Sequence, residues 1–366
     1  MNKKIILLYP YYNGTSGAFN RYLLLEKILK RAGLSVKFLV LCDKNYNSNY
    51  FKILYRLIKF IKVESIIFFY SVCKDYYFIT DFNPSIIALF SKKILIQIHD
   101  VSWENKNLGR HNLFFYRIFN FFIKYYSNVL TVSKTSMKAI KKVSGRKKRV
   151  YYLYNSVSEN YINESNKIGQ EKVFLKNKNS LKMIDRSLPN ILYIATLIPR
   201  KCHLDLLEAL SKVKILLNVN LVGLPIDKKI LELIKTQKNS RGNTIKSNIN
   251  YFPKLSQREL CNLLINSSAY ISTSLNEGFG IPVLEAKLYK VPLIIRDIDI
   301  NKELFPEAKF FKSTFELTNL LNKVETISKL EIEERRKIAS NINEDNLLNP
   351  FNYSNLSNEL KNIILD

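Results

Sequence analysis

The sequence predicts an α/β protein made of two Rossmann-like domains that face each other across a cleft. Three observations predict it. The chain of 366 residues is long for a single core and sufficient for two domains. Short apolar or β-branched runs alternate with helical patterns almost throughout, as in parallel sheets. A polar stretch without a clear apolar period, residues 158–188, separates the two halves as a predicted linker.

The first domain is predicted over residues 1–157. It begins with an apolar strand, Lys4–Tyr9, which is too short for a signal peptide. A loop and a helix from Gly17 to Ala32 follow, and Gly33 ends that helix. Further strands are expected at Ser35–Leu41, Ser65–Tyr70, Lys93–Ile98, Asn128–Val132 and Arg149–Tyr154.

The second domain is predicted over residues 189–350, and residues 351–366 form one more amphipathic helix. Ligands bind open α/β sheets beyond the carboxyl ends of the strands, so the chemistry is expected in loops that follow strands. Strands are expected at Asn190–Ala195, Ile215–Val222, Asn248–Phe252, Ala269–Ser274 and Pro292–Ile295, and helices at Leu204–Val213, Ile226–Thr236, Gln257–Ile265 and Pro282–Tyr289.

The net charge and the cysteine content limit the classes to which the protein can belong. The net charge is +26, from 57 Lys and Arg against 31 Asp and Glu, and this field attracts anionic partners. A general bias towards Lys, Asn and Ile explains the charge equally well. No basic block is long enough to predict a nucleic-acid partner. The four scattered cysteines favour a reducing cytoplasm, and no apolar run has the roughly 20 residues that a membrane span needs.

Residues 274–286 carry the strongest functional signal. A strand ends there, and Gly278 and Gly280 form a tight turn before a helix whose first amides make an anion site. Glu277 precedes the turn and Glu285 follows it, so both carboxylates can flank a ligand held by those amides. A carboxylate one turn into such a helix suits the hydroxyls of a ribose. The alternative is a carboxylate that only favours the helix dipole.

The string EGFGIPVLEA at residues 277–286 resembles the EGFGLPxLEA segment of family GT4 glycosyltransferases, which have the GT-B fold. The resemblance implies a nucleotide-sugar donor, no metal or other cofactor, and retention of anomeric configuration. It implies that Glu277 is catalytic as an orienting and electrostatic group. It also implies that Gly278, Phe279 and Gly280 bind the donor sugar and that Glu285 binds the ribose.

The string YIATLIPRK at residues 193–201 resembles the family segment that grips the donor diphosphate. Lys201 falls on the family's lysine, whereas Thr196 stands at the usual arginine and Cys202 at the usual glycine. Arg200 is placed to compensate, so either one cation or two act on the phosphates. Preorganised positive groups stabilise the charge of a leaving diphosphate. The alternative is a solvated Arg-Lys pair at a helix start.

The first half resembles the family at separate points. The string GAFNRY, which begins at Gly17, is similar to a GGxGRY loop that approaches the donor phosphate or the acceptor. His99-Asp100 follows a strand at the family's HD position, so His99 is predicted to be catalytic. Ser133 and Asn155 follow strands at positions that line the family's cleft. The segment 351–353 resembles the start of a last helix that returns to the first domain.

Asp297 and Asp299 form a literal DxD, a pattern that can bind a divalent cation between donor phosphates. Three-residue matches arise readily by chance, and the GT-B resemblance implies no metal. We therefore expect no metal site.

Two basic helical patterns in the first half predict peripheral binding to the anionic inner face of the membrane. One places Lys52, Arg56 and Lys59 opposite Ile53, Leu54, Leu57, Ile58 and Ile61, and the other spaces Arg110, Arg117 and Lys124 through an aromatic-rich segment. The alternative is two ordinary helices packed on the first sheet.

Together these features predict a cytoplasmic, peripherally bound enzyme that moves a hexose from a GDP- or UDP-linked donor, with mannose favoured. The expected acceptor is a glycan or lipid-linked glycan in the synthesis of O-antigen or capsule. Two alternatives stay open. One is a nucleotide-sugar epimerase or hydrolase on the same fold, and the other is a non-enzymatic basic binding protein.

Overall fold

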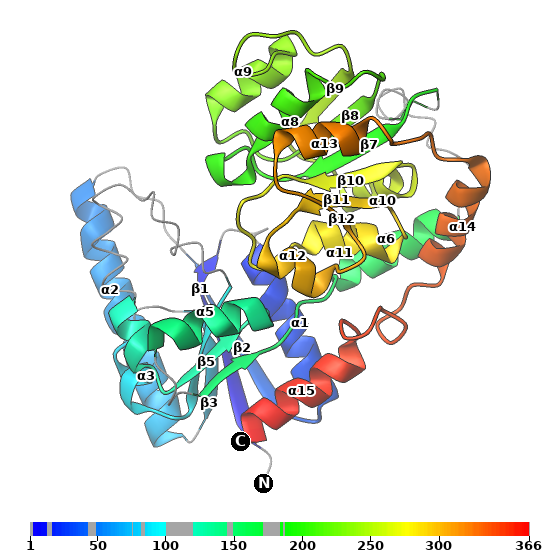
Figure 1. The fold of residues 1–366 in the computed structure, drawn as a ribbon. Coiled ribbons are helices and arrows are strands. Elements are labelled where there is room, and N and C mark those ends of the chain that lie inside the picture. The colour runs from blue at the N-terminus through cyan, green and yellow to red at the C-terminus, as the bar shows by residue number, and fades with distance from the viewer. Residues whose placement is uncertain are drawn as a thin grey trace. The chain divides into compact units, whose positions relative to one another are not determined.

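The computed structural model describes residues 3–12, 17–42, 49–74, 76–81, 85–99, 120–144, 149–170, 184–185 and 187–365. The chain forms two compact units: unit 1 contains Met1–Ser156 and Asn349–Asp366, and unit 2 contains Val157–Leu348. Each unit is built on a six-stranded parallel sheet with helices packed against it (Figure 1). The predicted α/β class with two parallel sheets is confirmed.

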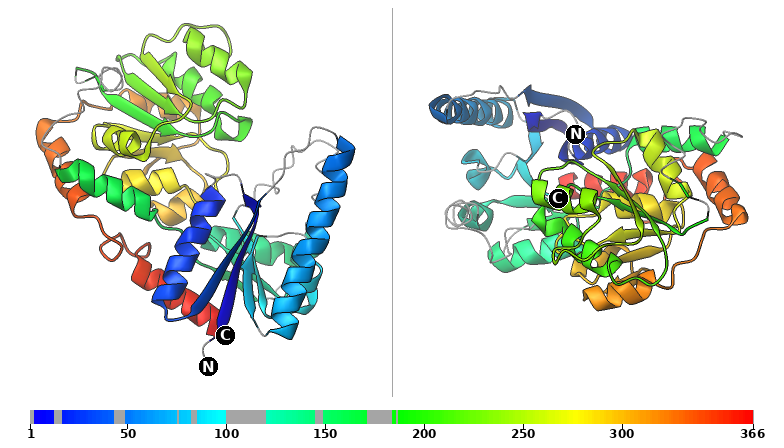
Figure 2. Two further views of the ribbon diagram at one scale, coloured as in Figure 1. Left: turned by 180° about the vertical axis from the view of Figure 1, so that it is seen from behind. Right: turned by 90° about the horizontal axis from the view of Figure 1, so that it is seen from above.

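In unit 1 the strands lie in the order β2-β1-β3-β4-β5-β6. The strand sequences are almost wholly apolar because helices cover both faces of the sheet (Figure 2). The last helix, α15, packs against α1, where Ser357 Oγ donates a hydrogen bond of 2.9 Å to the Ile28 carbonyl. The elements are β1 Lys4–Tyr12, α1 Gly17–Arg31, β2 Ser35–Cys42, α2 Asn49–Phe68, η1 Phe69–Cys73, β3 Tyr77–Thr80, α3 Ile87–Phe90, β4 Ile94–Ile98, β5 Asn128–Thr131, α5 Lys134–Ser144, β6 Arg149–Tyr152 and α15 Tyr353–Leu365.

The strand predicted at Ser65–Tyr70 is wrong, because this segment is the end of α2 and the start of the π-helix η1. The apolar run has the composition of a strand, but its burial has a helical period: Val63 and Ile67 enter the core, whereas Phe68 is exposed. The third strand is β3 instead.

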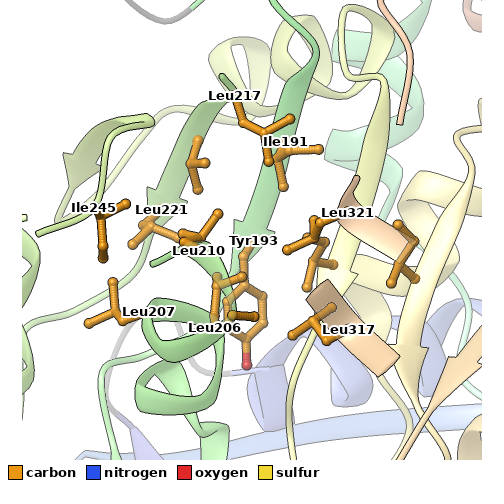
Figure 3. Close-up of a cluster of buried hydrophobic side chains, with 14 of the residues drawn as sticks. Ile191, Tyr193, Leu206, Leu207, Leu210, Leu217, Leu221, Ile245, Leu317 and Leu321 are labelled. Atoms are coloured by element: carbon orange, nitrogen blue, oxygen red, sulfur yellow. The ribbon is translucent and has the colours of Figure 1, made fainter. Parts of the chain in front are cut away.

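In unit 2 the strands lie in the order β12-β11-β10-β7-β8-β9. Figure 3 shows part of its core, where leucines of α8 and α13 close over β7 and β8 around Tyr193. The Tyr193 hydroxyl points away from these leucines. The elements are α6 Glu159–Gln170, β7 Asn190–Ile194, η3 Pro199–Lys201, α8 His203–Leu210, β8 Asn218–Val222, α9 Lys228–Thr236, β9 Asn248–Phe252, α10 Gln257–Ile265, β10 Ala269–Ser272, α11 Ile281–Leu288, β11 Leu293–Arg296, α12 Asp299–Leu304, β12 Lys309–Phe311, α13 Thr314–Leu321 and α14 Lys329–Ser340.

The segment 158–188 differs from the predicted linker, since its first part is the helix α6, which packs on α10 and α14. The helix was not predicted because its buried residues Tyr161, Ile162 and Ile168 are few and lie among polar residues. Ser165 Oγ donates a hydrogen bond of 3.1 Å to the Ala339 carbonyl. A Cβ on Gly169 would lie 2.2 Å from the Ser340 amide nitrogen, so only glycine permits this approach.

Candidate active site

Loops of unit 2 meet beyond the carboxyl ends of β7 and β10. These strands are neighbours in the sheet, so η3, which follows β7, lies beside the loop 273–280, which follows β10. The Leu275 amide donates a hydrogen bond of 3.0 Å to the Arg200 carbonyl, and Arg200 Nη1 donates one of 3.2 Å to the Asn276 carbonyl. The structure therefore brings the two predicted donor motifs together.

The main chain at Lys201 is held by two buried hydroxyls. Tyr193 donates to the Lys201 carbonyl at 2.6 Å, and Thr273 donates to the same oxygen at 2.9 Å. Cys202 then has φ +48° and ψ +45°, in the left-handed region that favours glycine. This geometry accounts for a glycine as the usual residue at this position in the motif.

Lys201 and Glu277 form the central ion pair of the site. Lys201 Nζ lies 2.5 Å from Glu277 Oε1, and the two side chains are only 14% and 13% exposed. A charge-assisted contact shielded in this way is much stronger than an exposed one. The pair holds the Lys201 ammonium against the carboxylate that directly precedes the glycine turn.

The glycine turn starts α11. Gly280 has φ +87° and its carbonyl accepts the Val283 amide at 2.9 Å, which begins the helix. Among the described residues, the amides of Gly280 and Ile281 donate no hydrogen bond. The Phe279 side chain is buried, so its contribution to a ligand would come from its main chain. These are the amides that the sequence predicts to form an anion site.

Glu285 lies one turn into α11 and is buried. Burial raises the pKa of its carboxyl to about 8. Within the described ranges the carboxyl has no hydrogen-bond partner, although the Glu285 carbonyl accepts the Tyr161 hydroxyl at 3.0 Å. A buried polar group without a partner is costly, which suits a site that a ligand completes.

His99, in unit 1, follows β4 in a polar cluster. The Gln97 amide contacts His99 Nε2 at 2.9 Å, and Asp81 Oδ2 lies 3.8 Å from the same nitrogen. Burial, and then the charge of Arg21, lower the pKa of His99 to about 3. The imidazole is therefore neutral at pH 7; with Gln97 as the donor, its proton resides on Nδ1.

The sequence analysis did not single out Arg21 or Asp81. Arg21 is buried and donates hydrogen bonds of 2.6 Å to the Tyr154 carbonyl and 2.8 Å to the Leu153 carbonyl. Burial lowers the pKa of Arg21 to about 9 and raises the pKa of Asp81 to about 7. Asp81 directly follows β3, so correct placement of that strand would have identified it as a residue at a carboxyl end.

The remaining predicted residues of unit 1 have different settings. Ser133 precedes α5, and its Oγ accepts the Ser136 amide at 3.0 Å, so this side chain caps the helix. Asn155 is buried just after β6, and its Oδ1 has no hydrogen-bond partner within the described residues. Gly17 is the first residue of α1, and Asp100 lies outside the described residues.

The DxD sequence is engaged in contacts with the protein itself. Asp297 pairs with Lys302 at 2.5 Å and with Lys312 at 3.7 Å, and Asp299 is the first residue of α12. In the described part of the chain, no three His, Cys, Asp or Glu side chains cluster in a way that could hold a metal ion. The ion pairs with Lys302 and Lys312 balance the charge of the Asp297 carboxylate without a bound ligand.

Comparison with solved structures gives the class of fold. The chain is similar to HepE of Anabaena, solved with UDP and glucose, with 16% identity, a TM-score of 0.66 and 99% of each chain covered. It is similar to WaaG, a glycosyltransferase involved in lipopolysaccharide biosynthesis, with 14% identity, a TM-score of 0.67 and 98% and 99% covered. A glycosyltransferase from Rickettsia africae matches with 19% identity, a TM-score of 0.65 and 100% and 98% covered. The fold is the GT-B fold.

Sequence comparison then gives the family. Residues 181–345 match the family described as Glycosyl transferases group 1. The mannosyltransferase WbdA of Escherichia coli is 27% identical over 173 residues, which is 46% of this chain and 20% of WbdA. The chain thus spans about a fifth of the length of the curated relatives it matches. This match covers the second half of the chain and agrees with the resemblance to group 1 glycosyltransferases that the motifs of that half predict.

Proposed function

We propose that this protein is a retaining glycosyltransferase that moves a hexose from a nucleoside-diphosphate sugar to a glycan or lipid-linked glycan. The observation that carries the proposal is the group of positive donors in unit 2: Lys201, Arg200 and the unused amides of Gly280 and Ile281. Such a group suits a diphosphate. The similarity to WbdA and WaaG supports a role in surface polysaccharide synthesis.

In this reaction the acceptor hydroxyl bonds to the anomeric carbon while the bond to the diphosphate breaks. The diphosphate leaves with the electron pair, and the acceptor proton passes to it or to solvent. Lys201 and the amides at the start of α11 are fixed before the charge develops, which is the condition under which they lower the barrier most. Glu277 orients Lys201 and the donor sugar, and the Glu285 carboxyl binds the ribose hydroxyls. In unit 1 we propose a catalytic role for neutral His99 and donor-binding roles for Gly17 and Asn155.

The donor is the finer part of the proposal. Similarity to a mannosyltransferase favours a GDP- or UDP-linked, mannose-like sugar, whereas HepE was solved with UDP-glucose. A thermal-shift panel with UDP, GDP, ADP and TDP distinguishes the bases, since a ligand at about 100 times its Kd adds about 2.7 kcal/mol of stability. We expect one nucleotide to raise Tm, and Lys201→Ala to reduce that shift.

The control is Lys212→Ala, which removes an equally charged but half-exposed side chain of unit 2. It should keep the full nucleotide response. A chain that responds to no nucleotide is not a nucleotide-sugar enzyme. Donor consumption without acceptor would instead indicate the epimerase or hydrolase.

We also propose that α2 holds unit 1 on an anionic membrane surface at the inner, cytoplasmic face. Ile58 and Ile61 are 55% and 56% exposed beside the exposed Lys62, while Val63 and Ile67 face the core. An apolar face with a cation beside it suits a bilayer interface. The side chains of residues 51–57 and all of residues 100–119 lie outside the described part, so the predicted faces at Lys52, Arg56, Arg110 and Arg117 stay predictions. In the described ranges no helix is long and apolar enough to cross a membrane.

Sedimentation with vesicles of phosphatidylcholine and phosphatidylglycerol at low salt tests this assignment. Ile58→Ser/Ile61→Ser should lower the bound fraction, because two apolar anchors are lost. Leu330→Ser, at an exposed leucine of unit 2, is the control and should bind as the parent does. Equal binding by all three proteins would remove α2 from the interface.

A further inference from the structure

The amino-terminal edge of the unit 1 sheet is lined with cations. The strands are parallel, so their first residues lie along one edge. Lys3 precedes β1, Lys92 and Lys93 precede β4, and Arg149 is the first residue of β6. His99 lies at the opposite edge of the sheet. The six residue steps from Lys93 to His99 span about 20 Å along β4.

These four cations line a cavity of about 410 Å³, together with Tyr77 and Asn128. No Asp or Glu is among the described residues that line it. The Lys3 ammonium donates to the Ile364 carbonyl at 2.5 Å and lies 4.6 Å from the centre of the Tyr77 ring, so its contacts leave its charge uncompensated. Lys92 is exposed, and its ammonium has no hydrogen bond to a described residue.

Cations gathered in a concave site repel one another, and an anion that binds among them relieves this repulsion. The volume is within the range of small-ligand sites, about 300–1,000 Å³. The hydroxyl of Tyr77 adds a neutral donor, and the Asn128 amide, which donates to the Lys92 carbonyl at 2.6 Å, keeps its second N–H. The buried residues Ile5, Phe78 and Leu95 add apolar surface. Lysine and arginine with neutral donors suit a phosphate group attached to an organic body.

We propose that this amino-edge pocket is a binding site for a phosphate-bearing ligand, separate from the site of sugar transfer. The phosphate is borne either by a small soluble molecule or by a lipid headgroup. The proposal does not depend on the assigned transferase activity, because it involves neither the loops of unit 2 nor the edge that carries His99.

Hydrogen–deuterium exchange with and without pyrophosphate locates the site. We expect protection of peptides that contain Lys92–Leu95 and Arg149–Tyr151, which distinguishes this pocket from a diphosphate site in unit 2. In titrations that follow these peptides, Lys92→Ala/Arg149→Ala should weaken binding about a hundredfold or more, since each of the two lost charged contacts contributes about tenfold or more. No protection at this edge would overturn the proposal.

The matched control is Lys141→Ala/Lys142→Ala, which removes the same charge from exposed positions on α5. It should bind as the parent does, and an equal loss in both double variants would show charge attraction without a site. Vesicles of phosphatidylcholine with and without phosphatidic acid distinguish the sources. Loss of vesicle binding by Lys92→Ala/Arg149→Ala assigns the pocket to a lipid phosphate; loss of pyrophosphate binding alone assigns it to a soluble one.

Discussion

The carboxyl edges of the two sheets differ in the charge of their central pair of polar residues. In unit 2, Lys201 and Glu277 lie 2.5 Å apart as an ion pair on a main chain fixed by two hydroxyls. In unit 1, burial favours neutral forms, because the pKa of His99 falls to about 3 and the pKa of Asp81 rises to about 7. The first edge suits the charge of a diphosphate, and the second suits neutral hydroxyl groups. The comparison can be tested one edge at a time.

The largest effect is expected from Lys201→Ala. Removal of one preorganised donor to a developing charge lowers kcat by about 100- to 1,000-fold. Steady-state kinetics with the donor found in the nucleotide panel measure it, and Lys212→Ala should keep the parent rate. A loss below tenfold would mean that the unit 2 edge does not carry the charge of the leaving group.

The sequence could predict those features of the unit 2 edge that depend on residues close together in the chain. A strand, a glycine turn and a helix start follow one another within residues 274–286, so the anion site and both carboxylates could be inferred from spacing. The contact between Lys201 and Glu277 joins residues 76 positions apart. Tertiary packing decides such a contact, and the family resemblance assigned the two residues to one donor site without predicting the ion pair.

The errors in the predicted secondary structure also have their cause in tertiary packing. The helix α6 buries Tyr161, Ile162 and Ile168 together with Ser165, and these few apolar residues are spread among polar ones in the sequence. The run Ser65–Tyr70 has the composition of a strand, and its assignment depended on which of its residues the sheet would bury. That error hid Asp81, since a residue at a strand end is recognised only when the strand is placed.

The two buried carboxyls give the next effect, on stability. Ionisation of a buried carboxyl disfavours the folded state, so its raised pKa makes the free energy of unfolding fall as pH rises. For Glu285 the fall spans pH 4.5 to about 8, and for Asp81 it spans 3.8 to about 7. Glu285→Gln and Asp81→Asn should each stabilise the protein above its own interval, on the order of 1–3 kcal/mol, and have little effect below it.

Urea unfolding across this pH range measures both variants against the parent. The two gains should appear in different intervals, with that of Asp81→Asn complete about one pH unit earlier. A gain that does not change with pH would show that the carboxyl concerned is not neutral in the folded protein. If this were found for Asp81→Asn, the unit 1 edge would not differ from the unit 2 edge in the way proposed.

The smallest effect concerns the left-handed residue that shapes the Lys201 turn. Cys202 has φ +48°, where a side chain costs about 1 kcal/mol that glycine avoids. Its thiol makes one contact, at 3.4 Å to the Pro199 carbonyl, which is weak for a sulfur donor. Cys202→Gly should therefore raise the free energy of unfolding of unit 2 by about 0.5–1 kcal/mol. Cys202→Ala keeps the Cβ and loses only the thiol, so it should give no gain. If alanine stabilised as much as glycine did, the thiol rather than the backbone would be the source of strain, and the turn would owe its shape to the hydroxyls of Tyr193 and Thr273 alone.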